Sequence, residues 1–423
     1  MHPHLWYPYF SAKTAPAPLV VKSAQGVWLE LADGRRLIDC ISSWWVNLYG
    51  HSHPRIAQAI YEQAQTLEHV IFSGFSHEPA EQLATQLVAR LDNQLRRVFY
   101  SDNGSNAVEI ALKMAYQYWA NQGEARSTFL SFTGAYHGDT FGAMSISSRS
   151  IFSAVFQDLL FKVETVEYPD TYDGDDAINQ REAQILQNIE QKIQSQPYAG
   201  IVIEPLVQGA GGMRMCRPQF LQQLRQLTTK HQTLLIFDEV MTGFGRTGAN
   251  FACQAAGVSP DLVCLSKGIT GGFLPFAVTI CTEEIYQGFY SDDPLHTLYH
   301  GHSYTANPLG CAAALAGLEL LQEYQPTFAG MAARHWSHLT TLRQHPLVSK
   351  VRVQGTIMAM NIGEDQGKGY LHEVGMKIRQ LSIEQGLLLR PLGNVLYLMP
   401  PYCITDEELS TVYEGMQQIL DSL

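Results

Sequence analysis

The stretch Leu234-Leu235-Ile236-Phe237-Asp238-Glu239 decides the fold, because a short apolar run that ends in polar residues predicts a buried β-strand. Similar runs lie on both sides of it in the chain: Arg97–Ser101, Thr128–Phe132, Gly200–Glu204, Leu262–Leu265 and Phe276–Cys281. Helix-like patterns separate several of them: Asn106–Trp119, Ala183–Gln194 and Gln219–Lys230. This alternation predicts an α/β fold with a mainly parallel sheet covered by helices on both faces. Because ligands of such sheets bind beyond the carboxyl ends of the strands, the residues that follow each run are the candidate functional residues.

A change of pattern near residue 307 predicts a second, smaller α/β domain. Beyond that point, helix-like stretches alternate with short strands: Leu309–Tyr324, Met358–Ile362, Gly369–Gln385 and Val395–Met399. The first fifty residues contain a strand-like run, Val27–Leu31, whose pattern fits packing with either domain. We expect a large domain over residues 51–306 and a small domain formed by residues 1–50 and 307–423.

The composition is that of a large globular protein. The chain has 423 residues, 46% apolar and 16% charged, against roughly 25% charged in an average soluble domain. So few charges indicate a large core and a subunit interface that removes further surface from water. The 28 basic and 40 acidic residues give a net charge of −12. This sign argues against nucleic acid or an anionic membrane as the partner.

Cysteine usage and the first residues favour the cytoplasm. The seven cysteines are scattered and none forms a C-x-x-C pair, which predicts reduced thiols without disulfides and no metal site. The first eight residues lack the basic region and apolar run of a secretory signal. No apolar run reaches the roughly 18 residues that a membrane span needs.

Three motifs at predicted strand ends can carry chemistry. Ser101–Asn106 places small residues at the start of a helix, which suits either a phosphate or a plain helix cap. Asp238 ends a fully apolar strand and needs a partner, which a metal, an arginine or a protonated heteroaromatic nitrogen would supply. Lys267 follows the strand Leu262–Leu265, where desolvation favours a nucleophilic amine that binds a carbonyl; a lysine that extends to solvent is the alternative.

Aromatic residues and one arginine complete the candidates. The run Ser42-Ser43-Trp44-Trp45 and the run Tyr136-His137-Gly138-Asp139 offer rings for a flat cofactor, or belong to the core. Arg390 ends an apolar run and suits either a carboxylate clamp or an interdomain ion pair. Gly243–Gly248 matches G-x-G-x-x-G, but it does not open a helix directly after a strand and lacks the later acidic residue, which argues against a nicotinamide cofactor.

Together these features match the four parts of pyridoxal phosphate. The cofactor has a phosphate, a pyridine nitrogen, a ring face and an aldehyde. The sequence offers an anion-binding helix start, a buried carboxylate, an aromatic ring and a desolvated lysine, all at strand ends. We therefore expect pyridoxal phosphate as the cofactor.

At these residues the sequence resembles the class III pyridoxal-phosphate aminotransferases over nearly its whole length. The resemblance rests on the run Phe237–Gly248 followed by Ser266-Lys267-Gly268. It implies that Lys267 binds the cofactor aldehyde and that Asp238 pairs with the ring nitrogen. It further implies the following cofactor contacts: Gly104 and Ser105 at the phosphate, Tyr136 on the ring, and Glu204 and Gln208 nearby.

Within this family the sequence is similar to members that aminate 8-amino-7-oxononanoate with S-adenosylmethionine in biotin biosynthesis. The likeness rests on Trp6–Tyr9, Ser42–Trp45, Tyr136–Thr140, His300–Ser303, and Arg390 with Leu396–Tyr402. It implies that Arg390 binds the substrate carboxylate and that Tyr9 is catalytic together with Lys267 and Asp238. It places these residues around the substrate: Tyr9, Trp44, Trp45, Tyr136, Gly301, Arg390 and Tyr397.

The same likeness implies a homodimer with shared active sites. Gly301, His302 and Ser303 would reach the cofactor and substrate of the neighbouring subunit, with His302 and Ser303 at the cofactor. His302-Ser303 stands where some members have Pro-Thr, so a hydroxyl is kept while its neighbour differs. Lysine as the amino donor, another ω-amino-acid aminotransferase or aminomutase, and a cofactor-binding protein without catalysis are the alternatives.

Overall fold

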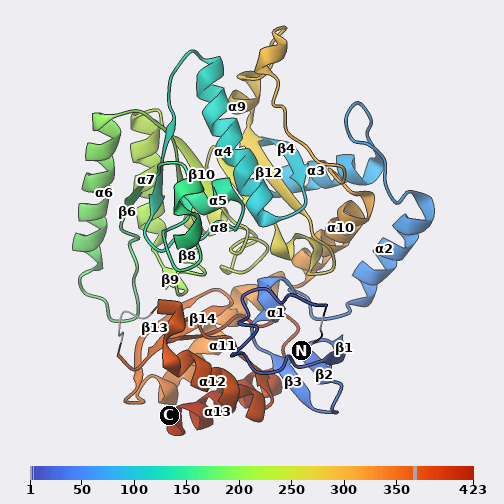
Figure 1. The fold of residues 1–423 in the computed structure, drawn as a ribbon, viewed down its shortest axis with the longest axis vertical. Helices are drawn as coiled ribbons and strands as arrows, with labels where there is room; N and C mark the ends of the chain where they lie inside the picture. The colour runs from blue at the N-terminus through green and yellow to red at the C-terminus, as the bar shows by residue number, and fades with distance from the viewer. Residues whose placement is uncertain (1, 3, 365–368) are drawn as a thin grey trace.

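A computed structural model describes residues 2, 4–364 and 369–423, and a seven-stranded sheet forms the centre of its larger part (Figure 1). In spatial order its strands are β4 (Leu95–Ser101), β12 (Ala277–Thr282), β11 (Leu262–Leu265), β10 (Leu234–Asp238), β7 (Tyr198–Ile203), β5 (Thr128–Phe132) and β6 (Glu164–Val166). β12 is antiparallel to both of its neighbours, and the strands from β11 to β6 are parallel. The predicted mainly parallel sheet is confirmed.

Helices cover both faces of this sheet. In β10, Leu234 and Ile236 pack in one core with α4 (Gly104–Asn121), whereas Leu235 and Phe237 pack in another with α6 (Ile178–Ser195) and α7 (Pro218–Lys230). This alternation follows from the twofold repeat of a strand, and a strand buried on both faces must be apolar at every position. The continuous apolar runs in the sequence have this cause.

The N-terminal segment joins the C-terminal part of the chain. β1 (Val21–Gln25), β2 (Trp28–Leu31) and β3 (Arg36–Asp39) form a sheet with β15 (Leu387–Leu388), in which β3 and β15 are parallel. Val27 and Ile38 share a core with Met358 and Leu396. Figure 1 shows both chain ends in the half of the molecule away from the large sheet.

The C-terminal part is built around a three-stranded antiparallel sheet. It consists of β13 (Val348–Gln354), β14 (Ile357–Ile362) and β16 (Val395–Leu398). Its helices are α11 (Gln325–Leu342), α12 (Glu373–Glu384) and α13 (Asp406–Asp421). The helix expected from Gly369 begins at Glu373, because Gly369–Leu371 forms a separate 3-10 turn, η4.

Helix α10 (Pro308–Glu323) lies with the large sheet and not with the C-terminal part. It packs against α2 (Pro54–Thr66) and α3 (Glu78–Arg90), and ten of its sixteen residues are buried. A helix that is apolar nearly all round needs partners on several sides, and the large part provides them. The predicted division at residue 307 places α10 in the small domain, whereas in the structure it packs with the larger part. The division into two domains stays a prediction.

Short elements connect these layers. They are α1 (Ser42–Trp45), α5 (Phe141–Ile146), η1 (Ala154–Leu159), β8 (Val207–Gln208), β9 (Arg214–Met215), α8 (Ala252–Ala256), η2 (Lys267–Thr270), α9 (Glu283–Gln287) and η3 (Pro294–His296). Within the described ranges, no helix combines the length and the hydropathy needed to cross a bilayer. The same residues contain no group of three or more His, Cys, Asp or Glu side chains suited to a metal ion.

Candidate active site

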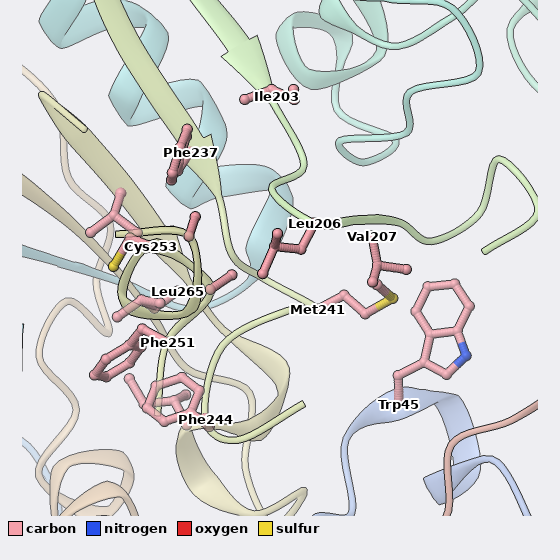
Figure 2. Packing of buried hydrophobic residues seen from close by; sticks show 14 of the residues in the cluster. Trp45, Ile203, Leu206, Val207, Phe237, Met241, Phe244, Phe251, Cys253 and Leu265 are labelled. Atoms are coloured by element: carbon pink, nitrogen blue, oxygen red, sulfur yellow. The ribbon is translucent and has the colours of Figure 1, made fainter. Parts of the chain in front are cut away.

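A cavity of about 270 Å³ lies at the carboxyl ends of the parallel strands. Its lining residues come from the ends of β5, β7, β10 and β11, from the start of α4 and from α1: Trp45, Asn103, Gly104, Ser105, Tyr136, His137, Gly138, Glu204, Asp238, Val240, Met241 and Lys267. Figure 2 shows Trp45, Val207 and Met241 in the apolar core, and two of them, Trp45 and Met241, also line this cavity. The topology thus brings together residues that lie far apart in the sequence, as expected for such a sheet.

Lys267 follows β11 and faces this cavity. Its Nζ lies 4.8 Å from the centroid of the Trp45 ring. Burial lowers the pKa of Lys267; the charges of Asp238 and Glu204 oppose this shift, and the Arg246 charge adds to it. A lowered pKa leaves a larger share of the amine neutral, which is the form that attacks a carbonyl. The backbone of Lys267 is left-handed, with φ 44°, so the position of this side chain depends on a strained residue.

Asp238, the last residue of β10, is held on both carboxylate oxygens. Its Oδ1 accepts a hydrogen bond from the Val240 backbone N–H at 3.0 Å, and its Oδ2 lies 2.6 Å from Nδ1 of His137. Burial acts to lower the pKa of His137, but the hydrogen bond and charge of Asp238, together with the charge of Glu204, raise it overall. A protonated His137 in turn stabilises an ionised carboxylate at Asp238.

The start of α4 forms an anion site at one end of the cavity. Asn103 caps the helix by accepting a hydrogen bond from the Asn106 N–H at 2.9 Å. The N–H groups of Gly104 and Ser105 have no acceptor among residues 2, 4–364 and 369–423. A Cβ at Gly104 would lie 2.6 Å from Val240, so glycine keeps this approach open. Free N–H groups at the positive end of a helix favour a phosphate.

Gly138 allows the β5 loop to lie against this anion site. Its φ is +131°, and a Cβ there would lie 1.8 Å from Oγ of Ser105. The next residue, Asp139, donates its backbone N–H to that hydroxyl at 3.2 Å. The donor set therefore fits pyridoxal phosphate: helix-end N–H groups for the phosphate, a held carboxylate for the ring nitrogen and an amine of lowered pKa for the aldehyde.

Glu204 and Gln208, predicted near the cofactor, differ in their surroundings. Glu204 lines the cavity and accepts hydrogen bonds from the Tyr136 N–H at 3.0 Å and the Gly209 N–H at 2.8 Å. Burial raises the pKa of Glu204 to about 7. The Gln208 amide donates to the Thr133 carbonyl at 3.1 Å, and the residue does not line the cavity. A direct cofactor contact of Gln208 stays a prediction.

A second cavity, of about 640 Å³, adjoins the first and shares Tyr136 and Gly138 with it. Beside it, the Tyr9 hydroxyl donates to Asp139 and lies 3.4 Å from the Tyr136 hydroxyl. Burial, followed by the hydrogen bond to Asp139, raises the pKa of Tyr9 to about 12. The Tyr9 ring meets the Trp44 ring edge-on, with centroids 5.6 Å apart.

The other predicted substrate residues form two further contacts. The Arg390 guanidinium carbon lies 4.5 Å from the Trp44 ring centroid, and the Trp45 indole N–H donates to the Tyr397 hydroxyl at 2.9 Å. The structure therefore brings Tyr9, Trp44 and Arg390 together, with Trp45 and Tyr397 as a separate pair. Their role in binding substrate stays a prediction.

Gly301, His302 and Ser303 do not line either of these cavities. Nε2 of His302 lies 3.9 Å from Oδ1 of Asp102, which places this segment beside the start of α4. A role in the active site of a neighbouring subunit stays a prediction.

Sequence reasoning did not assign roles to His137, Asn103 or Met241, all of which line the cofactor-sized cavity. The sequence could have indicated His137 as a site residue, because it follows Tyr136 after a predicted strand. Its pairing with Asp238 spans 101 positions in the chain and has no local signal.

Known proteins share both the sequence and the fold. The family model of class-III aminotransferases matches residues 9–420. An adenosylmethionine-8-amino-7-oxononanoate aminotransferase of Synechococcus elongatus is 59% identical, over 100% of this chain and 99% of that protein. The crystal structure of the protein of that name from Methanocaldococcus jannaschii has a TM-score of 0.90 and 32% identity, covering 99% of this chain and 97% of the other. A PLP-bound amine transaminase from an uncultivated Pseudomonas species has a TM-score of 0.92 and 30% identity, covering 99% and 98%.

These comparisons confirm the expected family, fold class and cofactor, and they show that the protein is an aminotransferase. The chain belongs to the class-III aminotransferases, the pyridoxal-phosphate enzymes whose donor set its cavity matches.

Proposed function

We propose that the protein transfers an amino group from S-adenosylmethionine to 8-amino-7-oxononanoate and so forms 7,8-diaminononanoate, a step of biotin biosynthesis. The observation that carries this proposal is the 59% identity, over the full length of both chains, to a relative that bears the corresponding name. The aromatic and cationic groups beside the larger cavity support it independently.

The residues of the smaller cavity have roles that this reaction needs. When bound, pyridoxal phosphate supplies an aldehyde that takes up amino groups and a ring that withdraws electrons. Lys267 would hold the aldehyde, Gly104 and Ser105 the phosphate, and Tyr136 the ring face. Nζ of Lys267, whose pKa burial lowers, would remove and return the proton on the carbon that bears the amino group.

Asp238 would hold the ring nitrogen and keep it protonated. His137 and the Val240 N–H hold its carboxylate in place for this contact. A protonated ring nitrogen would strengthen the electron withdrawal that the cofactor supplies when bound. Asp238 would thus act through the ring nitrogen, and Lys267 on the substrate carbon itself.

The residues beside the larger cavity suit the two substrates. An 8-amino-7-oxononanoate molecule is an apolar chain with a distal carboxylate, which Arg390 would bind while the aromatic side chains contact the chain. The rings of Tyr9 and Trp44 also suit a sulfonium donor, at about 0.5–2 kcal/mol for each cation–π contact. The remaining substrate contacts would come from Tyr136, Trp45 and Tyr397.

A homodimer with shared active sites is part of the proposal. Exposed aromatic and aliphatic side chains flank Gly301–Ser303, including Leu295 (78% exposed), Tyr299 (71%) and Tyr304 (63%). Such a cluster favours burial against a second copy of the chain. Equal mixing of inactive Lys267→Ala and inactive His302→Ala/Ser303→Ala subunits should restore part of the activity if each site uses both chains. No recovery in mixed dimers would contradict shared sites.

The cytoplasm is the proposed location. All seven cysteines are free and six of them are buried, as expected for a reducing compartment.

A panel of amino donors with 8-amino-7-oxononanoate as the fixed acceptor tests the proposed reaction. We expect S-adenosylmethionine to give 7,8-diaminononanoate with the purified holoenzyme. Turnover with lysine alone would support the lysine-dependent alternative. Activity with ornithine or 4-aminobutyrate and none with this acceptor would support another ω-amino-acid aminotransferase. Absence of any half-reaction with an amine would identify a cofactor-binding protein without catalysis.

A further inference from the structure

Five side chains form an unbroken ring of contacts beside the larger cavity, and we call this ring the collar. It consists of Tyr9, Trp44, Arg390, Tyr370 and Phe152. Ring centroids lie 5.6 Å apart for Tyr9 and Trp44, 5.4 Å for Tyr9 and Phe152, and 5.3 Å for Phe152 and Tyr370. The Arg390 guanidinium closes the ring, 4.5 Å from the Trp44 centroid and 3.2 Å from the Tyr370 hydroxyl oxygen.

The collar joins parts of the chain that are distant in sequence. Tyr9 comes from the N-terminal segment, Phe152 from the loop before η1, and Tyr370 from η4 in the C-terminal part. Phe152 and Tyr370 line the larger cavity, together with Tyr136 and Asp139. The contact between Phe152 and Tyr370 therefore connects the two parts of the molecule along the cavity wall.

Arg390 is the one cation of the collar, and the collar holds it without neutralising it. Within the described ranges its guanidinium has no carboxylate partner. Its Nη2 donates to the Tyr370 hydroxyl, and its Cζ atom lies over the Trp44 ring. A guanidinium restrained by neutral groups keeps its charge and its remaining N–H donors for an anion, and less side-chain entropy is lost when that anion binds.

We propose that Tyr370 and Phe152 determine the specificity of this site for an unbranched apolar chain that ends in a carboxylate. Tyr370 is a positioning residue, because it orients Arg390 through its hydroxyl. Phe152 contributes an apolar surface for the chain. This inference rests on the proposed function and deepens it, because it assigns acceptor selection to two residues that the sequence motifs do not contain.

Calorimetric titration of the holoenzyme with nonanoate and nonanamide tests the collar without turnover. The two probes have the same chain, both lack the 8-amino and 7-oxo substituents of the proposed acceptor, and only nonanoate carries a charge. We expect nonanoate to bind at least about tenfold more tightly than nonanamide, as a charge-assisted hydrogen bond to Arg390 requires. Equal affinities for the two probes would overturn the proposal.

Two variants separate the two roles. Tyr370→Phe keeps the ring and removes the acceptor of the Arg390 hydrogen bond, so the ratio of the two affinities should fall roughly fivefold while nonanamide binds as before. Phe152→Ala should lower the affinity for both probes alike, by about tenfold, and leave the ratio of the two affinities unchanged. The matched controls are Tyr61→Phe on the exposed side of α2 and Phe156→Ala in η1, which should change neither quantity.

The outcomes separate this inference from the proposed function. An unchanged ratio in Tyr370→Phe would overturn the positioning role, and unchanged affinities in Phe152→Ala would overturn the role of that ring. Turnover of 8-amino-7-oxononanoate by the unmodified enzyme, measured alongside, tests the proposed function alone. With that acceptor, Tyr370→Phe should raise KM roughly fivefold and leave kcat within twofold, a split that a general loss of structure would not produce.

Discussion

Nδ1 of His137 lies 2.6 Å from Oδ2 of Asp238, and both side chains are buried. The pair links the loop after β5 to the last residue of β10, two strands that are not adjacent in the sheet. A buried carboxylate needs a donor to remain ionised, and His137 supplies one from the side. His137 thus acts on the cofactor through Asp238, as a positioning residue.

Removal of His137 should weaken catalysis without destroying the cavity. In His137→Ala we expect kcat to fall by about 10–100-fold, the usual effect of losing a partner that orients a primary ligand. The pH profile of kcat should also change, because the titration of His137, whose pKa is raised by the hydrogen bond and charge of Asp238, is then absent. Steady-state kinetics over a pH series measures both effects. His231→Ala, a histidine at the end of α7, is the matched control, and an unchanged profile in His137→Ala would contradict the assignment.

Lys267 should be indispensable for both cofactor attachment and proton transfer. Lys267→Ala should lose the visible absorbance that bound pyridoxal phosphate gives, and its kcat should fall by about a thousandfold or more. Absorbance spectra and single-turnover assays measure these losses. Lys22→Ala, a solvated lysine in β1, should leave both unchanged. Persistence of the absorbance in Lys267→Ala would assign cofactor attachment to another amine.

The backbone conformation of Ser42–Trp45 should depend on the buried carboxylate of Asp39. Ser42, Ser43 and Trp45 all have left-handed backbones, with φ of 50°, 60° and 69°, which costs about 1–3 kcal/mol each. The Asp39 carboxylate restrains this turn: it accepts from the Ser43 hydroxyl at 3.0 Å and lies 2.8 Å from Nε2 of His51.

Asp39→Asn should therefore disturb Trp44 and Trp45 together. We expect a stability loss of about 1–3 kcal/mol, a changed near-ultraviolet circular dichroism and a lower kcat/KM. His51→Gln should have the same effects in weaker form, because it alters one of these two contacts of the Asp39 carboxylate and leaves the other. Asp33→Asn, in an exposed turn, is the control. If stability fell as expected while kcat/KM stayed unchanged, the Asp39 contacts would stabilise the fold without supporting catalysis.

Glu204 should make stability fall as the pH rises. Its pKa is about 7 in the folded protein, against an ordinary value of 4.5, so the folded state binds more protons than the unfolded state between these values. The stabilisation is complete below pH 4.5 and is lost as the pH rises through 7, by up to about 1.4 kcal/mol per pH unit. Urea unfolding of Glu204→Gln over this range should show a smaller slope than the unmodified protein.

The difference between Glu204→Gln and the unmodified protein separates the effect of Glu204 on stability from that of a second carboxyl group, Glu239. Burial also raises the pKa of Glu239 to about 7, but Glu239 is present in both proteins and cancels in the difference. Glu62→Gln on the exposed face of α2 should leave the slope unchanged. Identical slopes in Glu204→Gln and the unmodified protein would contradict the raised pKa.

Local sequence was sufficient for six of the seven strands of the sheet, all except β6, and for the residues at their ends. A strand buried on both faces is mostly apolar along its length, so β10 and β11 were visible as apolar runs, and β5 and β12 as mainly apolar runs that also contain Ser or Thr. Asp238 and Lys267 were visible for the same reason, since a charge that directly follows such a run is unusual.

The sequence by itself determined the α/β class, the family and the ends of the strands where cofactor residues lie, because these depend on short runs and motifs. Tertiary structure alone decided which helix packs on which part, as for α10, and which side chains meet across long separations. The His137–Asp238 pair and the contact between Phe152 and Tyr370 are of this kind. Such contacts depend on how distant segments pack, and a single sequence contains no local pattern that reports this.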